Sequence, residues 1–183
     1  MDMFKESRLV GGTALALHLG HRVSVDLDFF GKIDAPLEDI VFELSSFASV
    51  SPISASKKMR FLIVDGIKVD IVNYPYPWID SPVVENGVTL AGIQDIAAMK
   101  LSAITNRGTK KDFIDYYYLL KTYSLKELLD LYVRKFSDAQ LFTAIKSLTY
   151  FQDAEADPMP RMTENLDWEN VKKSIVDTVN AYI

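Results

Sequence analysis

The pair Asp65-Gly66 separates two runs that are rich in β-branched residues, residues 60–64 and 67–72. Asp-Gly adopts the left-handed backbone conformation that a two-residue hairpin turn requires, so the two runs are predicted to pair as antiparallel strands. In the second run apolar and polar side chains alternate, which places them on opposite faces of a sheet. The chain is therefore predicted to contain a β-sheet with one apolar face and a second face that carries Lys68 and Asp70.

Alternation also extends over residues 22–30 and predicts a strand with Asp26 and Asp28 on one face. The other face of this strand is expected to carry the apolar residues Val23, Val25, Leu27 and Phe29. Apolar residues at helical spacing predict a helix within residues 36–49, packed on the sheet. Another predicted helix, residues 12–19, is entered through two glycines.

In the second half of the chain the apolar spacing becomes helical. Helices are predicted over residues 93–105, 109–123, 125–136, 139–151 and 168–183. Gly108 is expected to end the first of these, and Thr109 followed by Asp112 predicts a capping box at the start of the next. We therefore predict an α/β (α+β) protein, in which residues 1–91 form a small mixed sheet with flanking helices and residues 92–183 form a helical region packed on it.

The composition narrows the chemistry. The 183 residues include no cysteine, which excludes disulfides, thiolate zinc sites and a cysteine nucleophile. The formal net charge of -5 opposes binding of bulk nucleic acid, so a polyanionic partner would need a local basic patch. No apolar run approaches the roughly 20 residues that a membrane span requires, so we expect a soluble, cytoplasmic protein.

Two sets of residues could form a basic patch or simply solvated surface: Lys57, Lys58, Arg60 and Lys68, and separately Arg107, Lys110 and Lys111.

Asp26 and Asp28 are the clearest candidate metal ligands. Side chains two residues apart on a strand share a face, so these carboxylates would repel each other unless a cation neutralises them. Magnesium prefers hard oxygen ligands and is usually held by one or two carboxylates together with phosphate and water. If the second hairpin strand lies beside the strand of Asp28, then Asp70 joins the pair, and Mg²⁺ (or Mn²⁺) is the predicted cofactor. The alternatives are a surface acid pair and a salt bridge between Asp70 and Lys68 or Arg60.

The turn Gly11-Gly12-Thr13 has the properties of a phosphate-binding site. Glycines let the backbone approach an anion closely, and the free N–H groups at the start of the following helix point toward it. A tight turn that binds no ligand is the alternative. The proximity of this turn to the strand aspartates in the sequence favours phosphate binding, because a phosphate and a metal ion would then be neighbours.

The two histidines and a run of three tyrosines are given structural interpretations. His18 and His21 lack the spacing partners of a zinc site, so we interpret His18 as helix surface and His21 as a turn residue. Tyr116-Tyr117-Tyr118 could stack on bases, but on a helix such a run mostly buries one or two rings in the core.

Two segments resemble a known family. LVGGTALALHLGHRVSVDLDFF, residues 9–30, resembles the opening motif of the AbiEii/AbiGii toxin nucleotidyltransferases, a bacterial branch of the DNA polymerase β-like nucleotidyltransferase superfamily. KLSAITNRGTKKDFIDYYYLL, residues 100–120, looks like the later signature of the same family. The likeness covers most of the chain and implies a nucleotidyltransferase fold. One departure is the short lead-in before Gly11, since family members generally carry a longer one.

The resemblance implies a role for each matching residue. The glycine turn would bind the triphosphate of a nucleotide and the two strand aspartates would bind Mg²⁺, with Asp70 completing the acidic site. Lys100 would contact the phosphates or stabilise the leaving pyrophosphate, and Asp112 would help to form the nucleotide or acceptor site. The structural alternatives are a solvated lysine and a helix cap. The signature also contains Arg107, which is expected to bind nucleotide, and Lys111 and Asp115.

The resemblance implies an enzyme that transfers a nucleoside monophosphate from a nucleoside triphosphate to an acceptor hydroxyl and releases pyrophosphate. It suggests the toxin of a bacterial toxin–antitoxin pair of the abortive-infection type. The acceptor would be tRNA or another RNA, and a cognate antitoxin would act without forming a stable complex. Two alternatives remain: a nucleotidyltransferase that modifies a small molecule of the antibiotic type, and a non-catalytic nucleotide-binding module.

Overall fold

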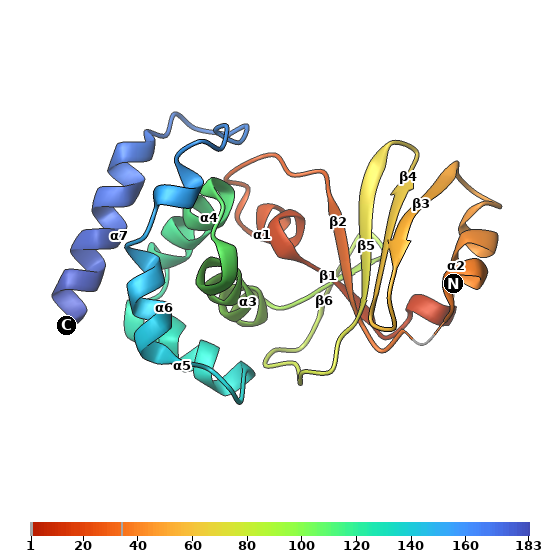
Figure 1. Cartoon of the computed structure of the whole chain (residues 1–183), viewed down its shortest axis with the longest axis horizontal. Helices are drawn as coiled ribbons and strands as arrows, with labels where there is room; N and C mark the ends of the chain where they lie inside the picture. Colours follow the sequence, from red (N-terminus) through yellow and green to blue (C-terminus); the bar gives the residue numbers. More distant parts are fainter. Residues whose placement is uncertain (1, 34) are drawn as a thin grey trace.

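A mixed β-sheet runs through the computed structural model, which describes residues 2–33 and 35–183 (Figure 1). Its strands are β1 (Ser7–Val10), β2 (Leu27–Gly31), β3 (Val50–Ala55), β4 (Met59–Val64), β5 (Ile67–Asn73), β6 (Val83–Glu85) and β7 (Val88–Leu90). They lie in the order β3-β4-β5-β2-β1-β7-β6. Because β2 pairs in parallel with β5 and antiparallel with β1, the predicted mixed sheet is confirmed.

Two hairpins turn through residue pairs with positive φ. At the predicted hairpin, β4 and β5 are joined by Asp65 (φ 49°) and Gly66 (φ 82°). Asn86 (φ 48°) and Gly87 (φ 80°) join β6 and β7 in the same way. Asn-Gly favours this turn as strongly as Asp-Gly does, yet the sequence analysis did not predict the second hairpin. Its strands have three residues each, too few to show an alternating pattern.

The strand predicted over residues 22–30 is shorter in the structure, because β2 begins only at Leu27. The segment before it turns toward a different part of the chain, since the N–H of Val23 donates to a backbone carbonyl in the loop that precedes the last helix. Val23 and Val25 are consequently 45 % and 63 % exposed. The prediction of one strand over residues 22–30, with these two valines on the same face as Leu27 and Phe29, is therefore wrong for the residues before Leu27.

Helices cover both faces of the sheet, but very unequally (Figure 1). One face is covered by α2 (Leu37–Leu44), together with a short 3-10 turn at Asp2–Phe4. The helices on the other face are α1 (Gly11–Leu19), α3 (Ile93–Arg107), α4 (Lys110–Leu120), α5 (Leu125–Lys135), α6 (Leu141–Leu148) and α7 (Trp168–Tyr182). The five helices predicted for the second half of the chain are confirmed. None of the helices that the structure describes is long and apolar enough to cross a bilayer.

The helix predicted within residues 36–49 is present, but it ends at Leu44. Ile40 is fully buried against the sheet, as expected for the apolar face of this helix. Phe47 lies in the turn beyond the helix and is 75 % exposed, so it does not extend that face. The apolar spacing therefore located the helix correctly and overestimated its length.

Two apolar clusters stabilise these layers. The smaller one lies between the sheet and α2 and consists of Ile33, Ile40, Leu62, Val69 and Ile71. The larger one includes residues of β1 and α1 as well as residues of every helix from α3 to α7. The sheet and the helical layer thus share a core. A division of the chain into domains 1–91 and 92–183 stays a prediction.

A buried ion pair links α3 to α5. Lys135 Nζ lies 2.6 Å from Asp95 Oδ1, and both side chains are fully buried. Asp95 also accepts hydrogen bonds of 2.9 Å from the backbone N–H groups of Ile79 and Asp80. The pair therefore attaches the loop between β5 and β6 to the helical layer.

Replacing Lys135 by methionine is expected to lower the free energy of unfolding by about 3–5 kcal/mol, because the Asp95 charge stays buried without its cation. Unfolding in urea, followed by circular dichroism, measures the change. Lys126→Met is the matched control, since Lys126 pairs with Asp130 on the surface, where ion pairs contribute little. Equal destabilisation of the two variants would contradict the assignment of this pair as the attachment of the β5–β6 loop to the helical layer.

Candidate functional site

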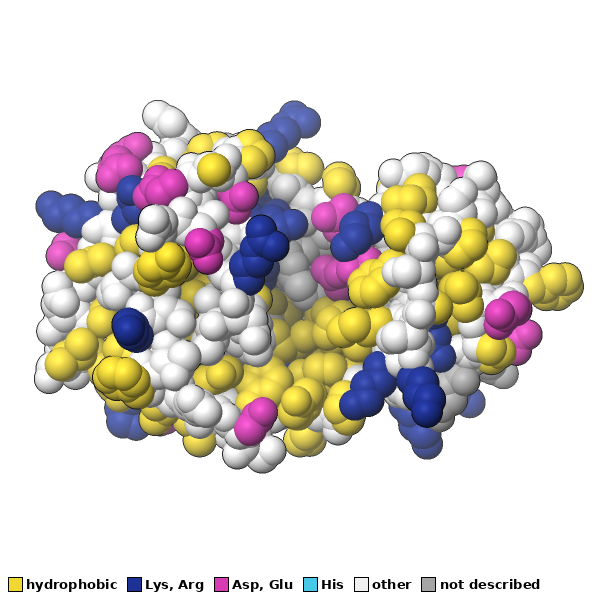
Figure 2. Space-filling view, viewed as in Figure 1, with side chains coloured by type: hydrophobic (Ala, Val, Ile, Leu, Met, Phe, Trp, Pro, Cys, Tyr) yellow, Lys and Arg dark blue, Asp and Glu magenta, His cyan; other side chains and the backbone are white. Residues whose placement is uncertain are grey.

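A cleft of about 780 Å³ separates the sheet from the helical layer. Figure 2 shows it as a hollow in the middle of the molecule, with charged side chains around its upper part and hydrophobic side chains along its floor. Its walls come from β2 and β5 on one side and from α1, α3, α4 and α5 on the other. The predicted site residues that line it are Gly11, Gly12, Asp26, Asp28, Lys100 and Asp112.

Asp28 and Asp70 are directly opposite each other in the parallel pairing of β2 and β5. One carboxylate oxygen of Asp70 lies 2.7 Å from Lys68 Nζ. The other, Oδ1, is buried and has no hydrogen-bond partner among the described residues. Burial raises the pKa of Asp28, and the nearby charge of Asp70 raises it further. The two carboxylates therefore lie close together without full compensation of their charges.

Asp26 lies just before β2, and its carboxylate is 3.9 Å from Lys111 Nζ. Within residues 2–33 and 35–183, no three acidic or histidine side chains are grouped closely enough to hold one metal ion. The predicted meeting of three carboxylates is thus not assembled in this structure. The donors nevertheless fit a hard cation, because it would satisfy the unpaired oxygen of Asp70 and relieve its repulsion with Asp28. Metal binding by Asp26, Asp28 and Asp70 stays a prediction.

The glycine turn packs directly against the charged groups of the site. Gly11 has φ +70°, and a Cβ at this position would lie 2.3 Å from Asp28 Oδ2. A Cβ on Gly12 would lie 2.1 Å from the nearest guanidinium nitrogen of Arg22. Both positions therefore require glycine. Because α1 begins at Gly11, its first free N–H groups lie at the cleft, where an anion can bind.

Thr13 is buried and does not line the cleft. Its hydroxyl donates to the backbone carbonyl of Asp26 and lies 3.0 Å from the hydroxyl of Ser24. Thr13 thus positions the loop that carries Asp26. Its side chain therefore does not face the cleft, and phosphate binding by the N–H groups of the Gly11-Gly12-Thr13 turn stays a prediction.

A buried ion network lies behind the glycine turn, centred on Asp115 of α4. Its carboxylate oxygens accept hydrogen bonds from Arg22, at 2.6 Å from Nε and 2.9 Å from the terminal nitrogen, and lie 2.7 Å from Lys100 Nζ. His21 Nε2 lies 2.8 Å from the same carboxylate. Burial alone would raise the pKa of Asp115, but Lys100, Arg22 and His21 hold it well below its usual range. Asp115 therefore stays ionised and fixes three side chains.

Lys100 joins this network to the cleft wall. Its ammonium also lies 2.8 Å from Asp112, whose second oxygen accepts hydrogen bonds from the N–H (3.1 Å) and the hydroxyl (2.5 Å) of Thr109. The predicted capping box of α4 is thus confirmed. Burial would lower the pKa of Lys100, but the charges of Asp115 and Asp112 raise it, so the ammonium stays charged. Contacts of Lys100 and Asp112 with a nucleotide remain predictions, because each side chain already has protein partners.

In each of the two predicted basic clusters, one cation is buried and the others stay nearer the surface. Arg60 is buried and donates to the carbonyl oxygens of Ile33 (3.2 Å) and Ala35 (2.6 Å). Lys110 is also buried and donates to two backbone carbonyls in the connector after α6. Arg107 is exposed and does not line the cleft, so its predicted role in nucleotide binding is not supported by its position.

Several side chains of the site were misjudged from the sequence. Arg22 was not singled out, although it follows His21 directly within the first family-like segment. His21 was interpreted as a turn residue, but it is buried, and its ring centroid lies 4.8 Å from that of Tyr118. His18 was interpreted as helix surface, yet its Nε2 lies 2.8 Å from the carbonyl of Ala91. Two features of the sequence could have indicated this network: the pair His21-Arg22 in the first family-like segment, and Asp115, which was given no role, in the second.

The mixed sheet, the glycine-led helix and the aspartates of β2 and β5 lie in the arrangement that the family resemblance implied. The family described as the nucleotidyl transferase AbiEii toxin of type IV toxin–antitoxin systems matches residues 4–181. The chain therefore belongs to the AbiEii nucleotidyltransferase family, as its motifs predicted, and it is a nucleotidyltransferase. An uncharacterized protein from Aquifex aeolicus is 36 % identical over an alignment of 183 positions, which covers 96 % of this chain and 87 % of that protein.

Solved structures share the fold at low sequence identity. JHP933 from Helicobacter pylori is 22 % identical with a TM-score of 0.66, over 98 % of this chain and 84 % of that one. MenT4, a nucleotidyltransferase toxin from Mycobacterium tuberculosis, is 16 % identical with a TM-score of 0.60, over 97 % of this chain and 77 % of that one. These likenesses confirm the predicted nucleotidyltransferase fold.

Replacing Asp115 by asparagine is expected to lower the free energy of unfolding near pH 7 by about 3–5 kcal/mol, because Arg22 stays buried without its carboxylate and Lys100 keeps only Asp112. The folded-state pKa of Asp115 lies below the unfolded value of about 3.9. Its stabilisation is therefore present above that pH and is lost as the pH falls through the folded-state pKa, so the variant should lose less stability on acidification than the wild type.

Urea unfolding near pH 7 and near pH 3 measures both effects. Asp177→Asn, at an exposed position of α7, is the control for loss of an acidic group and is expected to match the wild type near pH 7. If Asp115→Asn and the wild type lost equal stability on acidification, the ionised state of Asp115 would be refuted.

Proposed function

We propose that the protein transfers a nucleoside monophosphate from a nucleoside triphosphate to a hydroxyl of an RNA acceptor in a metal-dependent reaction. The observation that carries this proposal is the register of β2 and β5, which sets Asp28 beside Asp70 at the end of a glycine-led helix. Family membership supports the same reaction class.

The carboxylates would hold the metal. Bound by Asp26, Asp28 and Asp70, Mg²⁺ or Mn²⁺ would neutralise charge on the phosphate oxygens. Asp70 would also orient the acceptor hydroxyl or accept its proton, through a carboxylate oxygen that the metal ion leaves free. The hydroxyl oxygen then bonds to the α-phosphorus, and the bond to the bridging oxygen breaks as pyrophosphate leaves.

The phosphates would be bound by the start of α1 and by the half-exposed lysines of the cleft rim. The N–H groups that follow Gly11 and Gly12 attract negative charge. Lys68 lines the cleft beside Asp70, and Lys111 lines it beside Asp26. Both lysines are about half exposed, so they can turn toward a triphosphate, and a metal ion on Asp70 would take the place of Lys68 beside that mostly buried carboxylate.

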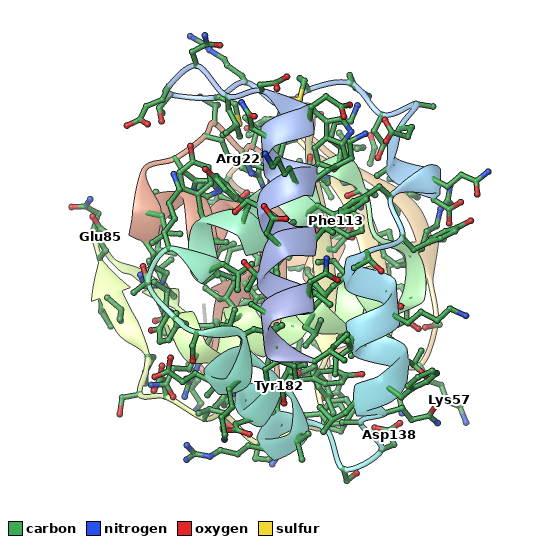
Figure 3. All side chains as sticks on the ribbon, turned by 90° about the vertical axis from the view of Figure 1, so that its left-hand side faces the viewer. Arg22, Lys57, Glu85, Phe113, Asp138 and Tyr182 are labelled. Carbon is green, nitrogen blue, oxygen red and sulfur yellow. The ribbon has the colours of Figure 1, made fainter. Side chains whose placement is uncertain are left out.

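An RNA acceptor is supported by surface charge near the cleft. Lys57 and Lys58 are exposed at the turn between β3 and β4, next to Met59 of the cleft wall. Figure 3 shows Lys57 and Asp138, which lines the cleft, on one side of the molecule and Glu85 on the opposite side. The family's place in toxin–antitoxin systems further suggests a toxin that acts on tRNA or another RNA in the cytoplasm, countered by a cognate antitoxin without a stable complex.

Replacing Asp28 by asparagine is expected to reduce nucleotide transfer about 10²- to 10³-fold, because a charge that stabilises the reacting phosphate through the metal is removed. Transfer of label from each α-labelled triphosphate to total RNA, with and without Mg²⁺, measures the effect. Asp26→Asn should behave similarly, whereas the surface variant Asp177→Asn should transfer label like the wild type. Unchanged transfer by both site variants, or transfer to an aminoglycoside in place of RNA, would refute the proposal.

Gly11→Ala and Gly20→Ala form a matched pair. Both glycines have positive φ (+70° and +65°), but only a Cβ on Gly11 meets Asp28, since nothing lies within 4 Å of a Cβ on Gly20. Each substitution should therefore cost about 1–2 kcal/mol of stability from the left-handed backbone. Only Gly11→Ala should abolish transfer, as measured with the same labelled triphosphates at a temperature where both variants are folded. Equal transfer activities in the two variants would show that the glycine turn has no part in the reaction.

A further inference from the structure

The lower part of the cleft contains aromatic side chains that the proposed phosphate chemistry does not use. These residues, which we term the aromatic floor, are Phe30, Tyr74, Tyr76, Tyr132 and Phe136. Each ring contacts the next: the centroid distances are 5.2 Å for Phe30–Tyr74, 5.2 Å for Tyr74–Tyr76, 5.0 Å for Tyr76–Phe136 and 5.5 Å for Tyr132–Phe136. Figure 2 shows hydrophobic side chains along this part of the cleft.

The aromatic floor continues the two strands that carry the carboxylates. Phe30 follows Asp28 by two residues in β2, so it lies on the same face about 7 Å farther along the strand. Tyr74 follows Asp70 by four residues, and its N–H extends the pairing by donating to the carbonyl of Gly31 at 2.9 Å. Along these two strands the cleft therefore has a charged end followed by an aromatic end. This order matches a ligand with phosphates at one end and a flat ring at the other.

Tyr74 offers the aromatic floor a polar group for recognition. Its hydroxyl is buried and has no hydrogen-bond partner among the residues that the structure describes. Burial raises the pKa of Tyr74, and the charge of Asp95 raises it further, so the hydroxyl stays protonated and can donate a hydrogen bond. A buried hydroxyl without a partner is unfavourable in the free protein. A ligand that supplies a partner would remove this cost.

The aromatic floor is also held rigidly from behind. Lys135 Nζ lies 5.2 Å from the ring centroid of Tyr74 and 4.8 Å from that of Trp78, and it is fixed by its buried pair with Asp95. Its ammonium also donates to the carbonyl of Pro77 at 3.1 Å. The rings are therefore preorganised, which reduces the entropy lost when a planar ligand binds.

We propose that the aromatic floor binds the nucleobase of the incoming nucleoside triphosphate and that the Tyr74 hydroxyl, by hydrogen bonding to that base, determines which triphosphate is used. The inference rests on the proposed function, because the phosphates of the same molecule must occupy the glycine turn. The base of the incoming nucleotide fits better than a base of the acceptor, since its covalent connection to the phosphates follows the order of the two ends of the cleft.

The first experiment uses calorimetry to compare the affinities of the intact protein, with Mg²⁺, for two kinds of ligand. These are the nucleoside triphosphates, each measured separately, and inorganic tripolyphosphate, which has no base. Tyr76→Leu should weaken binding of the triphosphates about tenfold to a hundredfold, because base–aromatic stacking is lost. It should leave tripolyphosphate binding unchanged. Tyr150→Leu, at an exposed tyrosine outside the cleft, is the matched control and should bind both ligands like the wild type.

The second experiment removes only the hydroxyl group. Tyr74→Phe should change the ratio of affinities between the preferred triphosphate and the other three about three- to tenfold, with tripolyphosphate binding unchanged. Tyr182→Phe makes the same chemical change on α7, away from the cleft, and should leave the ratio as in the wild type. Thermal unfolding of each variant checks that it is folded at the temperature of the measurement.

The outcomes separate the two proposals. If the wild type binds tripolyphosphate as tightly as every triphosphate, or if Tyr76→Leu weakens both ligands equally, the base-binding role is overturned while the proposed function stands. The same holds if Tyr76→Leu leaves triphosphate affinity unchanged and raises only the KM for RNA, which would assign the floor to the acceptor. A wild type that binds neither ligand overturns the proposed function and the base-binding role together.

Discussion

Asp115 carries a charge in a fully buried position, and the arrangement of the cleft depends on how that charge is compensated. Arg22 reaches it from the loop after α1, and Lys100 reaches it from α3. Gly12 leaves the space that the Arg22 guanidinium occupies. The conformation of the glycine turn and the path of the chain toward Asp26 are thus set by a carboxylate that does not itself line the cleft.

The charges of this network also determine what the cleft can do. Arg22 and Lys100 are balanced by Asp112 and Asp115, so the buried part of the site has no cation to spare for a ligand. Phosphates must therefore be neutralised by groups nearer the surface: the start of α1, the rim lysines and a metal ion on the β2 and β5 carboxylates. This division explains how a protein with an acidic overall charge can present a site for a polyanion.

Local patterns in the sequence were sufficient for much of this architecture. Asp65-Gly66 specified its hairpin because the required backbone conformation depends on those two residues alone. Alternation in β5 placed Asp70 on the face opposite Val69 and Ile71, where the structure has it. The capping box of α4 was predictable for the same reason. So was the burial of one or two rings of the tyrosine run, of which Tyr116 is completely inaccessible to solvent.

What the sequence could not supply were partners distant along the chain. Arg22 and Asp115 are separated by 93 residues, and no periodic pattern identifies such a pair. The late start of β2 has the same origin. The segment before it, which was predicted to be strand, bonds to a loop more than a hundred residues away in the sequence. The aromatic floor escaped notice because its rings come from β2, from a proline-containing loop and from α5, each unremarkable alone.

The two tryptophans of the chain occupy very different surroundings. Trp78 lies behind the aromatic floor with cations on it, the guanidinium of Arg8 at 4.4 Å from the ring centroid and the ammonium of Lys135 at 4.8 Å. Trp168 begins α7 and packs against Phe113 and Phe151 in the helical layer. Each half of the chain therefore contains its own intrinsic fluorophore. Fluorescence from single-tryptophan forms can show whether the sheet region and the helical region melt together, without any added label.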